Sequence, residues 1–281
     1  MVVDPELTWL LRPGRRRHPV RVEVAPTDTL GHVVQMLGIP LTEVGGLLLD
    51  ERPAAPSEHC GVPVAPRTRS VLPRPRPQPT RTMPPRFLLD VHLGSLARRL
   101  RLLGVDTAYE TDAEDRELVR RAVAEERVLL SRDRGLLMRT SLPEGALVRG
   151  DRTDDQLLDV LQRFVPPLAP WTRCIRCNTL LQAVPMAEVA DELEHGTRRS
   201  YRDFSRCPRC QRVYWRGAHS APLEAIVAAA EAVVSGRSLP QEDARAVSRP
   251  VGSAPASPPD AGTTGSPGPS RRPGPRPPTR R

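Results

Sequence analysis

The chain has 281 residues, a length that suits about two domains, but its 33 prolines and 3% aromatic residues leave part of it unsuited to a packed core. All 42 basic residues are arginine, and the formal net charge is +9. No segment approaches the roughly 18 consecutive apolar residues of a membrane span, so we expect no membrane contact.

The positive charge is concentrated in two segments. Residues 62–86 carry six arginines and no acid, residues 236–281 carry eight arginines and three acids, and residues 87–235 carry 22 of each. Such basic segments either hold a polyanion through its phosphates or remain solvated chain. Four of the five cysteines stand in Cys-x-x-Cys pairs, which suits metal binding in a reducing cytoplasm better than disulfides.

Residues 5–72 are predicted to form a small ββαββ domain. Its expected elements are strands 7–11 and 20–24, joined at Pro13-Gly14, a helix with apolar positions 30–37, and strands 47–49 and 70–72. This segment resembles the ubiquitin-like β-grasp domains related to sulfur carriers. Such carriers work through a free C-terminal Gly-Gly, whereas Gly45-Gly46 is internal, so we favour a binding module for a protein partner.

Residues 87–165 repeat a strand and a helix four times, after a Pro/Arg-rich linker at 73–86. The expected strands are 87–90, 105–109, 128–131 and 146–149, and the expected helices are 93–103, 115–125, 136–139 and 154–164. Repeated βα units with short turns predict a parallel sheet between two layers of helices. Residues 236–281 have the composition of a disordered tail.

Acidic residues stand where predicted strands give way to helices. Asp90 and Asp133 follow strands, and Asp115 begins a helix that Asp112 precedes. Because the carboxyl ends of parallel strands meet at one edge of the sheet, we expect Asp90, Asp115 and Asp133 to converge there. Carboxylates can hold Mg²⁺ or Mn²⁺, which activates water for phosphodiester hydrolysis. Asp112 is either a further acid or only a helix cap.

The two Cys-x-x-Cys pairs, separated by 29 residues, predict a zinc ribbon in residues 171–217. Four thiolates form a closed tetrahedral Zn²⁺ site, so the metal would be structural; the ligands are Cys174, Cys177, Cys207 and Cys210. The gap exceeds the usual roughly 15–20 residues, and Met186–Glu194 is interpreted as an inserted helix. A labile redox pair or a degenerate site is the alternative. Val213–Trp215 either stacks on a base or belongs to the ribbon core.

The run from Arg86 to Asp106 resembles the opening motif of the Mut-seven C-terminal RNase family, a branch of the PIN-like nucleases. Residues 115–118 and 128–134 resemble its second and third motifs, the cysteine region resembles its zinc ribbon, and members often carry an N-terminal ubiquitin-like domain. The resemblance implies a PIN-like three-layer α/β/α fold and metal-dependent RNA cleavage, with Asp90, Asp115 and Asp133 at the family's acidic positions. The family commonly has a second aspartate after the third motif, where this chain has Gly135.

The leading prediction is therefore a metal-dependent ribonuclease. One alternative is a catalytically decayed adaptor that binds RNA or protein, which Gly135 keeps open, and another is a component of sulfur-carrier chemistry. Arginines that flank the acidic edge are predicted to contact the phosphates of RNA. They are Arg98, Arg99, Arg132 and Arg134.

Overall fold

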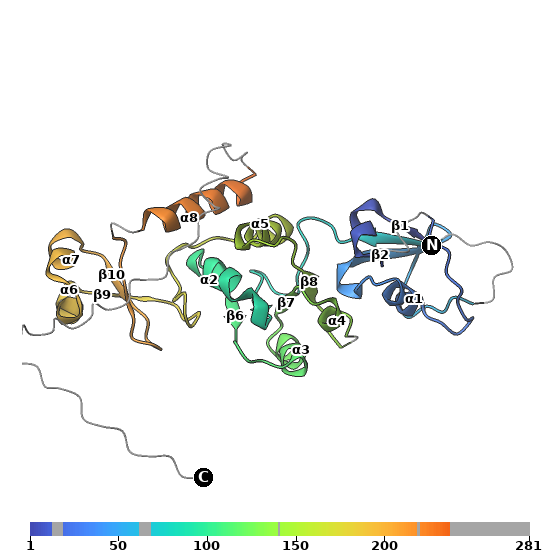
Figure 1. The fold of residues 1–281 in the computed structure, drawn as a ribbon, viewed down its shortest axis with the longest axis horizontal. Coiled ribbons are helices and arrows are strands. Elements are labelled where there is room, and N and C mark those ends of the chain that lie inside the picture. Colours follow the sequence, from blue (N-terminus) through green and yellow to red (C-terminus); the bar gives the residue numbers. More distant parts are fainter. Residues whose placement is uncertain (13–18, 62–68, 140, 218–219, 237–281) are drawn as a thin grey trace, which may run out of the picture. The chain divides into compact units, whose positions relative to one another are not determined.

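The computed structural model describes residues 1–12, 19–61, 69–139, 141–217 and 220–236 (Figure 1). The predicted hairpin turn at Pro13-Gly14 and nearly all of the predicted tail 236–281 lie outside this part. Within it, three β-sheets form, and no helix combines the length and the apolar character that crossing a bilayer requires.

The N-terminal sheet packs against a single α-helix, α1 (Leu30–Met36). Its strands are β1 (Val2–Val3), β2 (Val44–Leu49), β3 (Arg52–Ala54) and β4 (Arg69–Pro73). The strand order is β1-β4-β2-β3, with β1 parallel to β4 and β2 antiparallel to both of its neighbours. Thr29 caps α1 by accepting a hydrogen bond from the backbone of His32 (3.2 Å). The small α+β unit predicted for this part of the chain is confirmed.

Two predicted strands of this unit are wrong. Pro5–Leu10 forms a 3₁₀ helix instead of a strand. Three leucines of this segment are buried at helical spacing: Leu7, Leu10 and Leu11. Because the run Leu-Thr-Trp-Leu-Leu is almost wholly apolar, it does not distinguish a period of two from a helical period. Residues 20–24 form no strand either, and Val20 hydrogen-bonds to Met1 in both directions.

The predicted parallel sheet is present. Its strands are β5 (Phe87–Leu89), β6 (Thr107–Tyr109), β7 (Val128–Ser131) and β8 (Gly145–Leu147), in the order β6-β5-β7-β8. All three strand pairs are parallel. The helices are α2 (Gly94–Leu102), α3 (Asp115–Ala124), α4 (Arg134–Leu137) and α5 (Thr153–Phe164).

Successive side chains of β5, one of the two central strands, enter opposite layers. Phe87 and Leu89 pack in the core that contains α2 and α5, whereas Leu88 packs in the core that contains α3 and α4. Strand β7 alternates in the same way. The predicted three-layer α/β/α architecture is therefore confirmed, and the carboxyl ends of β5 and β7 lie side by side at one edge.

Polar contacts link the N-terminal unit to the α/β unit. Glu43 is buried, and its carboxylate pairs with the buried guanidinium of Arg163 (3.0 Å) and accepts a hydrogen bond from the backbone of Leu147 (2.7 Å). The guanidinium of Arg134 donates to the carbonyl of Leu10 (2.6 Å). Apolar side chains of both units share one core.

The cysteine region forms a three-stranded antiparallel sheet of β9 (Gln182–Val184), β10 (Phe204–Arg206) and β11 (Val213–Tyr214), in the order β11-β10-β9. The expected inserted helix is short: α6 (Met186–Val189) and a 3₁₀ turn precede α7 (His195–Ser200). A further helix, α8 (Ala221–Val234), was not predicted. It packs Ile226 and Ala230 into the core with α2 and α5.

Candidate active site and metal centre

Asp90 lies directly after β5, and its side chain is buried, with 3% of the residue exposed. One carboxylate oxygen accepts a hydrogen bond from the backbone N–H of His92 (2.9 Å). The other accepts one from the hydroxyl of Ser131 and one from the backbone N–H of Arg132 (3.2 Å). All three of these partners donate, so they hold the carboxylate of Asp90 in one orientation.

Ser131, the last residue of β7, connects the two aspartates that follow strands. Its hydroxyl donates to Asp90 and accepts a hydrogen bond from the backbone N–H of Asp133 (2.8 Å). Sequence reasoning missed this role, although a hydroxyl that ends an otherwise apolar buried strand was a visible signal. The hydroxyl of Ser131 thus links the carboxylate of Asp90 to the backbone of Asp133.

Asp115 begins α3, and its carboxylate pairs with Arg139 (3.2 Å), while Asp112 is exposed and accepts a hydrogen bond from Thr111 (3.2 Å). Among the residues that the structure describes, the only group of three or more acidic, histidine or cysteine ligand atoms within 4.8 Å of one another is made by cysteines. Asp115 therefore does not join Asp90 and Asp133 in a cluster of that size.

Gly135 lies next to the carboxylate of Asp133, whose Oδ1 accepts a hydrogen bond from the Gly135 N–H (2.7 Å). A Cβ atom built on Gly135 would lie 3.2 Å from that same oxygen. A side chain at this position would therefore emerge beside Asp133. The residue that departs from the family pattern is adjacent to the acidic edge.

Three of the four arginines predicted to bind phosphate already have partners. Arg99 is buried in an ion pair with Asp154, and Arg132 pairs with Asp151 (2.6 Å). Arg134 donates to the carbonyl of Leu10. Arg98, on α2, is exposed, and its guanidinium donates a hydrogen bond to the hydroxyl of Ser95 (3.3 Å). The four arginines thus differ in how free they are to meet a substrate.

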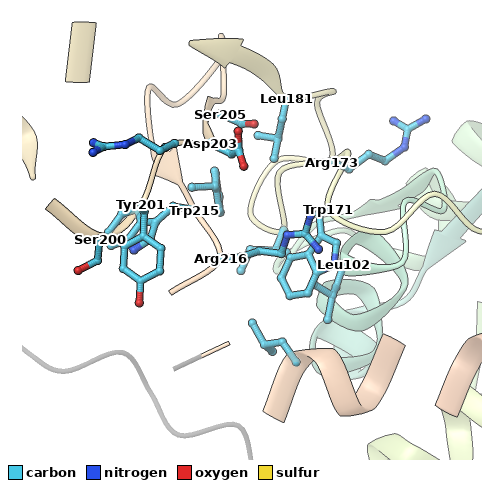
Figure 2. A pocket seen from close by; sticks show the side chains of 14 residues that line it. Leu102, Trp171, Arg173, Leu181, Ser200, Tyr201, Asp203, Ser205, Trp215 and Arg216 are labelled. Carbon is cyan, nitrogen blue, oxygen red and sulfur yellow. The ribbon is translucent and has the colours of Figure 1, made fainter. Parts of the chain in front are cut away.

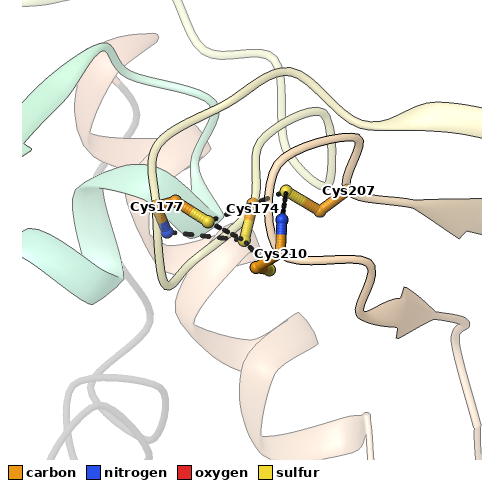
Figure 3. Close-up of side chains that lie close together, drawn as sticks. All are labelled: Cys174, Cys177, Cys207 and Cys210. Atoms are coloured by element: carbon orange, nitrogen blue, oxygen red, sulfur yellow. Dashed lines mark hydrogen bonds between the residues drawn. The ribbon is translucent and has the colours of Figure 1, made fainter.

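The four cysteine sulfurs converge at one end of the antiparallel sheet (Figure 3). The Sγ–Sγ distances are 3.4 Å for Cys174–Cys177 and 3.7 Å for both Cys174–Cys210 and Cys177–Cys207. Sulfurs placed tetrahedrally at about 2.3 Å from zinc are about 3.8 Å apart, so the spacing fits this ion. The four cysteines form a site that can hold a structural metal such as zinc.

The ionisation of these thiols also fits a cation. Although burial disfavours the thiolate, hydrogen bonds from Tyr214 and from backbone amides lower the pKa of Cys174 to about 6. Burial and the hydrogen bonds among the sulfurs raise the pKa of Cys177 above its usual range. Four adjacent thiolates repel one another, and a divalent ion between them would relieve that repulsion.

A parallel α/β sheet with carboxylates at its carboxyl edge, joined to a four-cysteine ribbon, defines a nuclease-like α/β protein. The family model for the Mut7-C RNAse domain matches residues 85–227, and the model for Mut7-C ubiquitin matches residues 1–67. The chain belongs to the Mut7-C RNAse domain family, as its motifs predict. No curated protein and no solved structure matches the chain.

Proposed function

We propose that the protein is a metal-dependent ribonuclease that cleaves RNA at the edge formed by Asp90 and Asp133. The observation that carries this proposal is the buried carboxylate of Asp90, held by three donors at the carboxyl end of a parallel strand. A buried ionised carboxylate is costly unless it is paired or coordinates a metal. This position is also where open α/β sheets bind their ligands.

Asp90 and Asp133 would hold Mg²⁺ or Mn²⁺, because one or two carboxylates together with substrate phosphates are the usual protein ligands of Mg²⁺. When bound, the ion would polarise the phosphodiester and lower the pKa of a water molecule. Ser131 fixes the orientation of Asp90 through its hydrogen bond. Asp115 would act as the third acid after it separates from Arg139, and Asp112 remains a possible further acid.

The other parts of the chain have supporting roles in this proposal. Zinc in the four-cysteine site would be structural, since four thiolates leave no position open for water. The ubiquitin-like unit would contact a protein partner, and RNA would be the substrate. Five free thiols favour a reducing location, which we propose to be the cytoplasm.

A catalytically decayed adaptor for RNA or protein is the second candidate. Two observations favour it: Asp115 is engaged by Arg139, and Gly135 supplies no carboxylate beside Asp133. Sulfur-carrier chemistry gains no such support. Gly45-Gly46 lies inside β2, where a Cβ on Gly45 would come 2.0 Å from the carbonyl oxygen of Pro73, so the glycine serves strand packing.

An RNA cleavage assay separates the two candidates. Zinc-loaded protein is incubated with single-stranded RNA in Mg²⁺ or Mn²⁺, beside the variants Asp90→Asn and Asp112→Asn. We expect the wild type to cleave and Asp90→Asn to be inactive. Asp112→Asn tests the further acid, and a reduced cleavage rate would assign Asp112 to the site. Cleavage by Asp90→Asn at the wild-type rate would refute the proposed site, and a wild type that binds RNA without cleaving it would support the adaptor.

A further inference from the structure

A cavity of about 340 Å³ lies where α2 and β6 meet the cysteine ribbon. Four arginines and two tyrosines dominate its lining, with Gly94 and Ile175, and no acidic residue takes part. The arginines come from three separate places in the chain: Arg98 and Arg101 from α2, Arg176 from the first Cys-x-x-Cys knuckle, and Arg212 from just after the second. Their convergence makes a concave site in which every charged side chain is an arginine.

Arg101 gives this cavity a fixed wall. It is 4% exposed, and its guanidinium donates to the carbonyls of Thr107 (2.8 Å), Ile175 (3.2 Å) and Arg176 (2.7 Å). These bonds tie the first knuckle to β6. The buried guanidinium of Arg101 therefore fixes the backbone at Arg176 relative to α2.

The other arginines of the cavity have no carboxylate partner in the part of the chain that the structure describes. No carboxylate of the described residues forms an ion pair with Arg98, Arg176 or Arg212, whereas Arg99, Arg121 and Arg127 on nearby elements are paired. Unpaired guanidinium groups around a cavity attract an anion, and their fork of N–H donors matches phosphate.

The cavity borders the acidic edge. Tyr109 lines it, and the Tyr109 hydroxyl donates to the carbonyl of Val91 (3.0 Å), the residue that follows Asp90. A Cβ on Gly94, which also lines the cavity, would lie 2.6 Å from the Tyr109 hydroxyl oxygen. A phosphate in the cavity would therefore lie close to the strand end that carries Asp90.

A second cavity, of about 490 Å³, shares Ile175 and Tyr214 with the first. Trp171, Tyr201 and Trp215 line it (Figure 2), and the guanidinium of Arg216 lies 6.0 Å from the centre of the Trp171 ring. Aromatic faces next to a basic track are the means by which proteins hold unpaired bases. A duplex keeps its bases stacked inside and cannot use such a surface.

We propose that the junction between the RNase domain and the cysteine ribbon binds single-stranded RNA, with backbone phosphates on Arg98, Arg176 and Arg212 and with bases in the aromatic cavity. This inference rests on the proposed function, because it takes RNA as the substrate. It adds the ribbon as the element that captures the strand and delivers it to Asp90.

The chain offers a matched control for the test. Arg176 and Arg209 occupy the same position in the two Cys-x-x-Cys knuckles, but only Arg176 lines the cavity. We would measure binding of a labelled single-stranded RNA by fluorescence anisotropy without added Mg²⁺ or Mn²⁺. The proteins are the wild type, Arg176→Gln/Arg212→Gln, Arg209→Gln and Trp215→Ala, each checked for zinc content and thermal melting.

We expect the double variant to bind on the order of tenfold more weakly at 0.1 M salt, and the slope of log Kd against log salt to fall by about 1.4, as loss of two phosphate contacts requires. Trp215→Ala should weaken binding of single-stranded RNA but not of a duplex. Arg209→Gln should bind as the wild type does.

Two results would overturn the inference. One is an RNA affinity of the double variant equal to that of the wild type. The other is a loss of affinity in Arg209→Gln as large as in the double variant, which would mean that only the net charge of the protein matters. Equal affinity for a duplex would also contradict it. Failure of the proposed function gives a different pattern, since RNA would then bind at the cavity and remain uncleaved when Mn²⁺ is added.

Discussion

At the scale of single residues, the site depends on a hydroxyl as much as on carboxylates. Ser131 donates to the carboxylate of Asp90 and accepts from the backbone N–H of Asp133, so the end of β7 orients the Asp90 side chain and holds the backbone of Asp133. Residues that orient ligands in this way commonly affect metal affinity or activity by about 10–100-fold. The two strand ends thus form one hydrogen-bonded unit.

Replacing Gly135 by aspartate tests whether the missing family carboxylate limits activity. The backbone at this position is not in the left-handed region, and the new Cβ would emerge 3.2 Å from Asp133 Oδ1, so a small side chain fits after a slight adjustment. We expect Gly135→Asp to need a lower Mn²⁺ concentration for half-maximal cleavage, because an added carboxylate strengthens cation binding. The measurement is a Mn²⁺ titration of the cleavage rate.

Gly135→Asn is the matched control, with the same size and no charge. It should keep the metal dependence of the wild type. An identical Mn²⁺ requirement in Gly135→Asp and Gly135→Asn would mean that position 135 does not reach the metal.

The sequence predicted that Asp90 and Asp133 lie at the same edge of the sheet, because parallel strands end at a common edge. It could not assign partners to the arginines, because ion pairs such as Arg99–Asp154 join helices that are distant in sequence. Nor could it show that Arg139, which comes after α4, engages Asp115. Such pairings depend on how helices pack, and charge patterns along one segment do not encode them.

At the scale of elements, the cysteine ribbon should depend on its metal. We predict that the wild type binds about one zinc ion per chain. Cys207→Ser should lose this zinc, and its residues 171–217 should lose their protection from hydrogen exchange, because such small sheets gain their folding free energy from the metal. Elemental analysis and hydrogen exchange would measure both. Cys60→Ala, which removes the remaining cysteine, should keep the zinc.

This prediction would be contradicted if the wild-type protein without zinc showed the same protection of residues 171–217 from hydrogen exchange as the zinc-loaded protein. Full zinc content in Cys207→Ser would contradict it as well, since three thiolates would then suffice.

Asp106 joins the parallel sheet to the first cysteine knuckle. Its carboxylate accepts hydrogen bonds from Arg127 (2.6 Å) and from the side chain of Asn178 (2.8 Å). Burial disfavours the charge, but these bonds outweigh it and lower the pKa of Asp106. We expect Asp106→Asn to reduce the free energy of unfolding by about 1–3 kcal/mol at pH 7.

The pH dependence of this difference has a definite sign. A depressed pKa stabilises the fold above the unfolded value, about 3.9, and the stabilisation is lost as the pH falls through the folded value. The stability gap between the wild type and Asp106→Asn, measured by urea unfolding, should therefore narrow below about pH 4. A difference in unfolding free energy that stays constant down to pH 3 would contradict an ionised Asp106 in this contact. Asp112→Asn, at an exposed position, is the control for removing a carboxylate.

Elements buried on both sides were predictable, and ambiguous apolar runs were not. β5 and β7 are short, fully buried runs between turn residues, as central parallel strands are. Residues 7–11 have the same apolar character but fold as a 3₁₀ helix, because Pro5 favours a helical start and the N-terminal core requires helical spacing. Helix α8 is rich in alanine, and its packing on the α2/α5 layer depends on tertiary structure.

At the scale of the whole molecule, the ubiquitin-like unit is packed against the RNase domain in the same chain. Both contribute to one hydrophobic core, and the buried Glu43–Arg163 pair joins them. Breaking such a pair by removing one partner commonly costs about 3–5 kcal/mol. The ubiquitin-like unit and the RNase domain therefore share apolar packing and one buried ion pair.

Single-turnover cleavage of single-stranded RNA by wild-type protein and Asp90→Asn, with Mn²⁺ and saturating enzyme, tests the proposed ribonuclease most directly. We predict that Asp90→Asn lowers the cleavage rate on the order of a thousandfold, because charge stabilisation at the reacting phosphate is lost. Cleavage at the wild-type rate by folded, zinc-loaded Asp90→Asn, or no metal-dependent cleavage by the wild type, would contradict the assignment.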